Sequence, residues 1–89
     1  MATGKRWRRE ELIAALMLYR KLAFGQLHGR NRDVIRLAEK LDRTPGSVAM
    51  KLCNFASLDP KLKKRGIKGL QGASERDREV WGEFAGYGG

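Results

Sequence analysis

The residues with the clearest potential chemistry follow Thr44 and Pro45, a pair typical of the first residues of a helix. Such a helix would turn several polar side chains away from its apolar face. Serine and asparagine can hydrogen-bond the edges of bases, lysine can reach guanine or a phosphate, and methionine can contact a methyl group. We therefore predict that duplex DNA is read by the outward residues of this helix, which are Ser47, Met50, Lys51 and Asn54.

Positive charge flanks this segment on both sides. The sequence holds 19 Lys and Arg against 10 Asp and Glu, a formal net charge of +9 that attracts polyanions. The helix N-terminus and the Thr44 hydroxyl could hold a phosphate, and a basic run follows the helix. The predicted contacts with the DNA backbone are Arg43, Thr44, Lys61, Lys63, Lys64, Arg65 and Lys68. The alternative, that these charges only solvate a helical surface, stays open.

A second basic group opens the chain and consists of Lys5, Arg6, Arg8 and Arg9. A basic arm can enter the minor groove next to a recognition helix. The other interpretation is a tail that contacts nothing.

Helical periodicity predicts the elements that would position these residues. Apolar residues at helical spacing predict a helix over 8–22 and another over 32–41, the latter capped by Asn31. A very short turn leads into a third helix over 45–56. Two short helices joined by such a turn are the signature of a helix-turn-helix, whose second helix enters the major groove.

The remaining segments are less regular. The segment 23–30 contains two glycines and is expected to be a loop, with Phe24 and Leu27 filling the core. The segment 58–73 alternates apolar and basic residues, and periodicity leaves open a hairpin-like wing or an irregular basic loop. A last helix is predicted over 74–85, where Ser74 and Asp77 occupy the positions of a capping box.

The predicted fold is therefore mainly α: a helix-turn-helix or winged-helix-like domain of three to four helices with a basic loop or small wing. Its length of 89 residues suits one domain. We expect a single DNA-binding domain over 1–89, with a basic arm at 1–7 and a three-helix core at 8–57.

Composition excludes several functional classes. One histidine, His28, and one cysteine, Cys53, supply neither the ligands of a zinc site nor an intramolecular disulfide. The sequence contains no cofactor motif and no paired nucleophile and base, so we predict no cofactor and no enzymatic activity of the chain by itself. No apolar run approaches the roughly 20 residues that span a bilayer, and no apolar signal region follows the basic N-terminus. We expect a cytoplasmic protein without a membrane partner.

Three stretches carry a resemblance to a known family. They are WRREELIAALMLYRKLAFGQLHGRN, then RTPGSVAMKLCNFASLDP, and then RGIKGLQGAS before a helix that contains tryptophan. The chain from residue 7 to about residue 85 resembles the N-terminal module of bacterial HNH restriction-like endonucleases. The most specific part is Arg43–Pro60 with Gly66–Leu70. The resemblance implies a winged-helix-like DNA reader, a nuclease domain that follows it in a full-length protein, and a sensor of methylated bases.

The sequence departs from this family in its histidines. HNH chemistry needs more than one histidine, and this chain has only His28. The nuclease is therefore expected to be absent, which leaves a fragment or a stand-alone DNA reader. We expect this domain to be a monomer or a weak dimer.

Other functions remain as alternatives. Trp7, the acidic pair Glu10 and Glu11, and the helix start at Arg43 and Thr44 resemble Myb or SANT domains, which are DNA-binding transcription regulators. A helical protein-interaction module that binds an acidic partner, or an RNA-binding protein, would also fit a basic helical chain.

Overall fold

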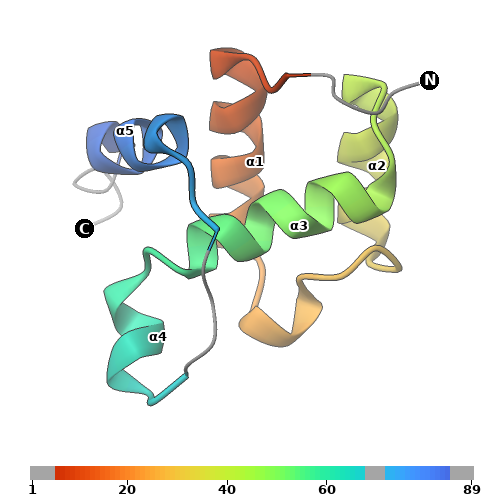
Figure 1. The fold of residues 1–89 in the computed structure, drawn as a ribbon. Coiled ribbons are helices and arrows are strands. Elements are labelled where there is room, and N and C mark those ends of the chain that lie inside the picture. The colour runs from red at the N-terminus through yellow and green to blue at the C-terminus, as the bar shows by residue number, and fades with distance from the viewer. Residues whose placement is uncertain (1–5, 68–71, 85–89) are drawn as a thin grey trace.

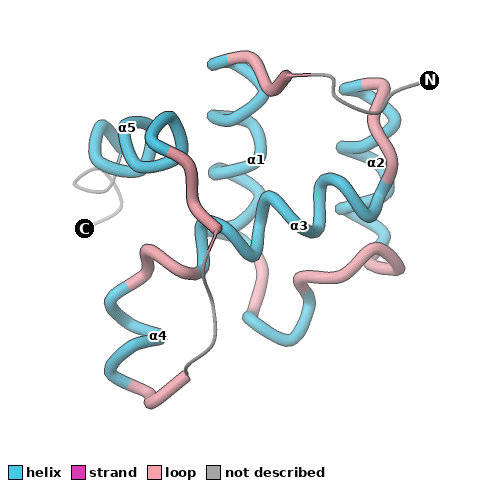
Figure 2. The backbone as a smooth tube through the Cα atoms, in the orientation of Figure 1, coloured by secondary structure: helices cyan, strands magenta, loops and turns pink. Residues whose placement is uncertain are grey.

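The computed structural model describes residues 6–67 and 72–84, and this part of the chain is mainly helical. Its longer helices are α1 (Arg9–Lys21), α2 (Arg32–Leu41), α3 (Pro45–Ala56) and α5 (Glu75–Phe84). A short helix, α4 (Pro60–Lys64), and a 3-10 turn, η1 (Phe24–Gln26), lie between them. Helix α3 crosses in front of α1 and α2, and α4 and α5 lie beyond its C-terminal end (Figure 1). The described residues contain no strand (Figure 2).

Helix α1 forms because its apolar residues recur at helical spacing and its ends suit the helix dipole. The backbone N–H of Arg8 donates to Glu11 Oε1 at 2.8 Å, which satisfies one of the N–H groups that a helix start leaves unpaired. Arg20 and Lys21 lie in the last turn, where cations are favoured. The prediction of a helix here is confirmed, and η1 follows it within the segment expected to be a loop.

The connection between α2 and α3 is as short as the sequence predicts. Asn31 caps α2 by accepting from the N–H groups of Asp33 and Val34. Asp42 ends the helix in the left-handed conformation, with φ of 56°. Thr44 Oγ1 then accepts from the N–H of Ser47 at 3.0 Å, and α3 begins at Pro45. Three residues therefore separate two capped helices.

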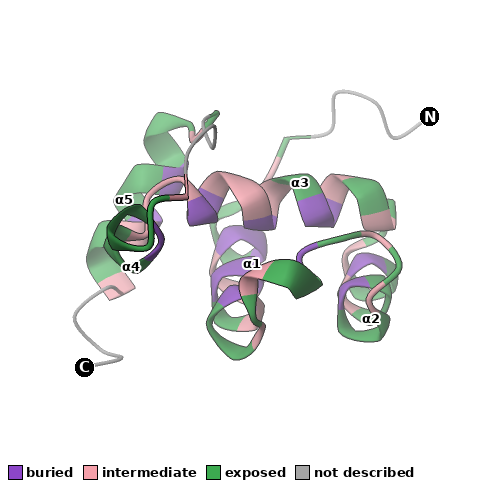
Figure 3. Ribbon diagram, turned by 90° about the horizontal axis from the view of Figure 1, so that it is seen from below, coloured by how far each residue is buried: buried purple, intermediate pink, exposed green. Residues whose placement is uncertain are grey.

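The core lies where α3 rests on α1 and α2. In Figure 3 the buried positions of α3 face these two helices and its exposed positions face away from them. Apolar side chains of each α-helix and of the loop residue Leu27 contribute to this core: Leu12, Ala15, Leu16, Tyr19, Leu27, Val34, Ala38, Val48, Ala49, Leu52, Phe55, Ala56, Leu62 and Val80. One face of α3 is thus committed to packing, and only the opposite face is available for recognition.

The segment after α3 corrects the expectation of a wing or an irregular loop. Residues 60–64 form α4, because Asp59 Oδ1 accepts from the N–H of Lys61 at 2.9 Å, Pro60 suits the first helical position, and Leu62 is buried. Residues 58–67 and 72–73 contain no strand, and residues 68–71 lie outside the described part of the chain.

Helix α5 begins with the predicted capping box. The N–H of Ser74 donates to Asp77 Oδ2 at 3.0 Å, and the N–H of Asp77 donates to Ser74 Oγ at 3.1 Å. The helix ends at Phe84, and residue 85 of the predicted range lies outside the described residues. Across residues 6–67 and 72–84, every helix is too short or too polar to cross a membrane.

Candidate nucleic-acid interface

Two of the four residues predicted to read bases, Ser47 and Met50, are accessible on the solvent-facing side of α3. Met50 is 64% exposed. Ser47 is half-buried in the first turn, one residue after the exposed Gly46. Thr44 is exposed, but its hydroxyl oxygen already accepts from the N–H of Ser47. The start of α3 therefore presents small and polar groups, which would let another molecule approach its backbone closely.

Asn54, the third predicted reader, is half-buried beneath Gly72. A Cβ added at Gly72 would lie 3.1 Å from Asn54 Oδ1, and the φ of Gly72 is +105°, a conformation that favours glycine. The chain thus passes close over the second half of α3 before α5 begins. Only the first half of the exposed face is left open by the described residues.

The expected outward position of Lys51 is wrong. Its side chain is only 11% exposed, and its Nζ lies 3.0 and 3.1 Å from the two carboxylate oxygens of Asp77, which is fully buried. The side chain bends toward α5 because an unpaired buried carboxylate would be costly. Lys51 therefore fixes α5 to α3, and its amino group is committed inside the protein.

Arg43, predicted to contact the DNA backbone, is also committed internally. Its side chain is 5% exposed and pairs with Glu11, with 2.9 Å between Arg43 Nη2 and Glu11 Oε1. The same Nη2 donates to the carbonyl oxygen of Arg6 at 2.6 Å. The guanidinium lies 4.1 Å from the centre of the Trp7 ring, a cation–π contact.

These contacts tie the N-terminal arm to the recognition segment. Trp7 covers Arg43 on one side, and Lys51 Nζ lies 5.4 Å from the same ring. Arg6 and Arg8 on either side of Trp7 are exposed. Arg43 thus positions two exposed cations beside α3 instead of serving as one itself. The arm residues 1–5, including Lys5, lie outside the described part of the chain.

The basic residues of α4 divide into two groups. Lys61, Lys63, Lys64 and Arg65 are all exposed. Lys61 and Arg65, one turn apart, line a groove on the side of α1 and α5, whereas Lys63 and Lys64 are not part of its lining. Lys68 lies outside the described residues. The predicted basic run therefore contributes Lys63 and Lys64 to the surface beyond the end of α3.

Sequence reasoning missed one exposed cation near the start of α3. A Cβ at Gly29 would lie 3.5 Å from the N of Gly46, so the loop before α2 lies against the first turn of α3. Arg30, the next residue in that loop, is exposed. No local pattern signals this contact, because it depends on how the loop folds back.

Helix α2 carries a further basic stripe on the side opposite its core residues. Its members recur at every fourth position and are all exposed, and they are Arg32, Arg36 and Lys40. The spacing could have been read from the sequence. Because the core-facing residues of α2 are Val34 and Ala38, the stripe points away from the α2–α3 contact. We assign it to the solvated surface.

The single cysteine of the chain lies within the scaffold. Cys53 is half-buried, its Sγ lies 3.9 Å from the carbonyl oxygen of Leu27, and burial raises the pKa of the thiol. Within residues 6–67 and 72–84, no group of three or more His, Cys, Asp or Glu is placed to hold a metal ion.

Comparison of the chain with protein-family models, with curated proteins and with solved structures gave no match. The resemblance to HNH endonucleases is therefore carried by the quoted residues alone.

Proposed function

We propose that the chain is a duplex-DNA-binding module of the helix-turn-helix type. The observation that carries the proposal is the start of α3. There, two capped helices joined by three residues leave Ser47 and the strongly exposed Met50 on an open helical face. A recognition helix enters the major groove with its N-terminal residues against base edges, which requires such an accessible first half.

Exposed cations lie beside this face and beyond the far end of α3, and they would neutralise phosphates. Arg6 and Arg8 flank it through the arm that Arg43 holds, Arg30 lies next to the first turn, and Lys63 and Lys64 follow its C-terminal end. Phosphate contacts position a protein on DNA and supply most of its affinity, whereas base contacts specify sequence. In the proposed interface Ser47 and Met50 read bases, whereas Asn54 lies beneath Gly72 on the covered half of α3. Lys51 and Arg43 are left out of the contact surface.

The family resemblance adds a narrower proposal. The module would be the recognition part of a restriction-type HNH endonuclease, and it would sense methylated bases. Met50 supports this reading because an exposed, polarizable thioether suits contact with a methyl group. The same surface would serve a Myb-like regulator without methyl preference, so binding to modified duplexes separates the two.

The test is fluorescence anisotropy of the chain with short duplexes that are unmodified, adenine-methylated or cytosine-methylated. The proposal predicts saturable binding that weakens steeply with salt. A methyl sensor binds one modified duplex at least about tenfold more tightly, which corresponds to roughly 1.4 kcal/mol. Met50→Ala should remove that preference, while Met17→Ala, which alters an exposed methionine of α1, should keep it. No binding at low salt, or tighter binding to structured RNA of equal length, would overturn the proposal.

The protein-interaction alternative draws less support from the surface. Among the described residues, the exposed large apolar side chains are Met17, Ile35 and Met50, one on each of α1, α2 and α3. A docking helix normally presents several apolar residues along one face.

A further inference from the structure

A groove lies on a different side of the molecule from the exposed face of α3. It is lined by residues of α1, η1, α4 and α5 and the segments next to them, and none of its lining residues belongs to α2 or α3. Its volume is about 550 Å³, within the range of small-molecule sites. We name it the α1–α4–α5 groove.

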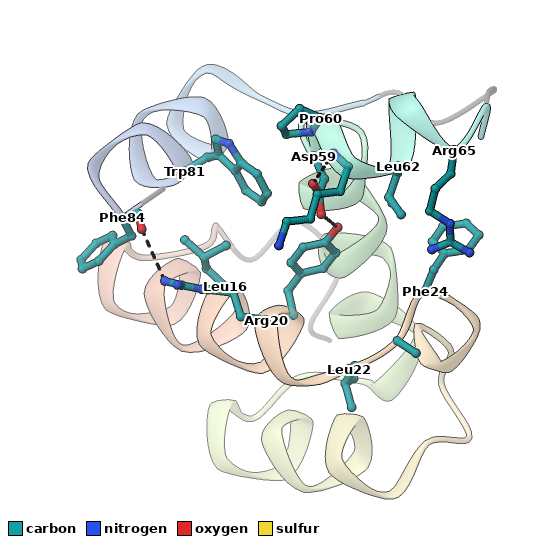
Figure 4. A pocket seen from close by; sticks show the side chains of 13 residues that line it. Leu16, Arg20, Leu22, Phe24, Asp59, Pro60, Leu62, Arg65, Trp81 and Phe84 are labelled. Atoms are coloured by element: carbon teal, nitrogen blue, oxygen red, sulfur yellow. Dashed lines mark hydrogen bonds between the residues drawn. The ribbon is translucent and has the colours of Figure 1, made fainter. Parts of the chain in front are cut away.

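Aromatic side chains form much of this groove. Tyr19 comes from α1, Phe24 from η1, and Trp81 and Phe84 from α5. Figure 4 shows Trp81 and Phe84 at one end and Phe24 at the other. Trp81 is held in place by its contacts with Tyr19, at 5.8 Å between ring centres, and with Phe55, at 6.4 Å. Flat apolar walls of this kind favour a planar ring as the ligand.

The charged residues of the groove are mostly cations. Arg20, Lys61 and Arg65 line it together with one carboxylate, Asp59. Figure 4 places Arg20 near Phe84 and Arg65 near Phe24, so the guanidinium groups lie at the two aromatic ends. This excess of positive charge favours a ligand that carries an anionic group next to its ring.

Asp59 supplies a directed polar contact between the two aromatic ends. Its Oδ2 accepts from the Tyr19 hydroxyl at 2.6 Å, and its Oδ1 accepts from the N–H of Lys61 at 2.9 Å. The carboxylate is therefore fixed in orientation. Because an ionised carboxylate can accept about four hydrogen bonds, each oxygen retains acceptor capacity. It would accept from an amino group on the ligand's ring.

We propose that the α1–α4–α5 groove binds a nucleotide whose base carries an amino group. The base would stack against the aromatic walls, its amino group would donate to Asp59, and its phosphate would be neutralised by Lys61 and Arg65. The nucleotide has two sources: a free mononucleotide, or an unpaired nucleotide within a nucleic-acid strand. The proposal does not rest on duplex binding by α3, because the two sites share no residue.

The experiment is isothermal titration of the 89-residue chain with AMP, adenosine and ribose 5-phosphate. AMP should bind saturably. Adenosine and ribose 5-phosphate should each bind at least about tenfold more weakly, because only AMP engages both the aromatic and the cationic groups. Absence of saturable AMP binding overturns the proposal. So does equal binding of AMP and ribose 5-phosphate, which would indicate a general attraction of phosphate.

Two double variants locate the site. Lys61→Gln with Arg65→Gln should weaken AMP binding at least about tenfold. Arg36→Gln with Lys40→Gln removes the same charge from the exposed stripe of α2 and should leave it unchanged. All four side chains are exposed, so both variants should keep the wild-type melting temperature. Equal weakening by the two variants overturns the assignment to the groove.

A competition assay distinguishes a free mononucleotide from an unpaired nucleotide within a nucleic-acid strand as the ligand. A duplex with one unpaired adenine and its fully paired counterpart are each added to the AMP complex. Displacement of AMP by the bulged duplex alone supports an unpaired nucleotide in a strand. Displacement by neither duplex supports a free nucleotide. Displacement by both duplexes equally contradicts the proposal, because a fully paired duplex offers no unpaired base.

Discussion

Lys51 on α3 and Lys63 on α4 have the same side chain and opposite environments. Lys51 lies against Asp77 in a nearly buried ion pair, whereas Lys63 is exposed one helix further along the chain. Arg43 and Arg6 form a second such contrast, because Arg43 is enclosed by Glu11 and Trp7 while Arg6 is exposed beside it. The net charge of the chain therefore divides into cations that hold the fold together and cations that are available to a partner.

This division gives α3 two different halves. Its second half is covered by Gly72 and by the capped start of α5, and the pair between Lys51 and Asp77 holds that cover in place. Its first half, around Ser47 and Met50, faces solvent. A recognition role for α3 is accordingly confined to its first two turns and to the exposed residues next to them.

The largest effect is expected when the buried pair is broken. Lys51→Met leaves the fully buried Asp77 carboxylate without its cation, which should lower the free energy of unfolding by about 3–5 kcal/mol. Lys63→Met, on an exposed lysine, should change it by less than about 0.5 kcal/mol. Urea denaturation of both variants measures the difference. Similar losses in the free energy of unfolding for the two variants would show that the burial of Lys51 does not make it more important for stability than Lys63.

A smaller loss is expected for Arg43→Lys. The charge is retained, but the flat guanidinium that contacts Glu11, the Arg6 carbonyl and Trp7 at once is lost. One charge-assisted hydrogen bond is worth about 1.5–3 kcal/mol, and we expect a loss of that size. In a Trp81→Phe background, the fluorescence of Trp7 should shift to longer wavelength as the arm detaches. An unshifted spectrum would mean that Arg43 does not hold the arm.

Tyr19 should make the stability of the folded chain depend on pH in the alkaline range. Burial, together with the hydrogen bond to Asp59, raises the pKa of the Tyr19 phenol above its ordinary value of 10.0. The folded chain therefore keeps a proton that the unfolded chain releases, so this stabilisation is complete below pH 10 and is lost as the pH rises further.

Thermal melts of wild type and Tyr19→Phe test this effect. At neutral pH the free energy of unfolding of the variant should be lower by about 1 kcal/mol, the usual net contribution of a hydrogen bond. Above the ordinary phenol pKa the difference should shrink, because phenylalanine has no proton to release. A constant difference across the alkaline range would contradict the assignment.

The smallest effect is expected for the exposed pair between Arg9 and Glu83. The hydrogen bond from Arg9 lowers the pKa of the Glu83 carboxyl below its ordinary value of 4.5. Any stabilisation is therefore present above that pH and lost as the pH falls. Because both side chains are about half exposed, solvent and salt screen their attraction. Arg9→Gln should have the same melting temperature as the wild type at neutral pH and physiological salt. A clear loss would show that exposed and buried pairs stabilise this fold alike.

The helices could be predicted from local features, because each is specified by residues within a few positions of its ends. Asn31, Thr44 and Ser74 cap their helices as expected, and Pro45 starts α3. Helix α4 was missed although Asp59 and Pro60 resemble Thr44 and Pro45 in their roles. The glycines and the alternation of apolar and basic residues over 58–73 favoured a loop or wing, and α4 itself is only five residues long.

The candidate site was less predictable, because the fate of a cation depends on contacts distant in sequence. The partner of Lys51 is 26 positions away and that of Arg43 is 32 positions away. Helical periodicity placed Lys51 next to Met50 and Asn54 on the outer face, but a long side chain can turn toward a buried carboxylate. Met50 is uncharged and 64% exposed, and its exposure follows from the helical face alone.

The most direct test measures duplex affinity against salt concentration for wild type, Lys63→Gln with Lys64→Gln, and Arg36→Gln with Lys40→Gln. The two variants lose equal charge, and both should melt like the wild type. If Lys63 and Lys64 contact phosphates, their variant should reduce the slope of log affinity against log salt by about 1.8, close to 0.9 for each contact, while the α2 variant keeps the wild-type slope. Equal slopes for the two variants would contradict the account, because the cations beyond α3 would then contribute only overall charge.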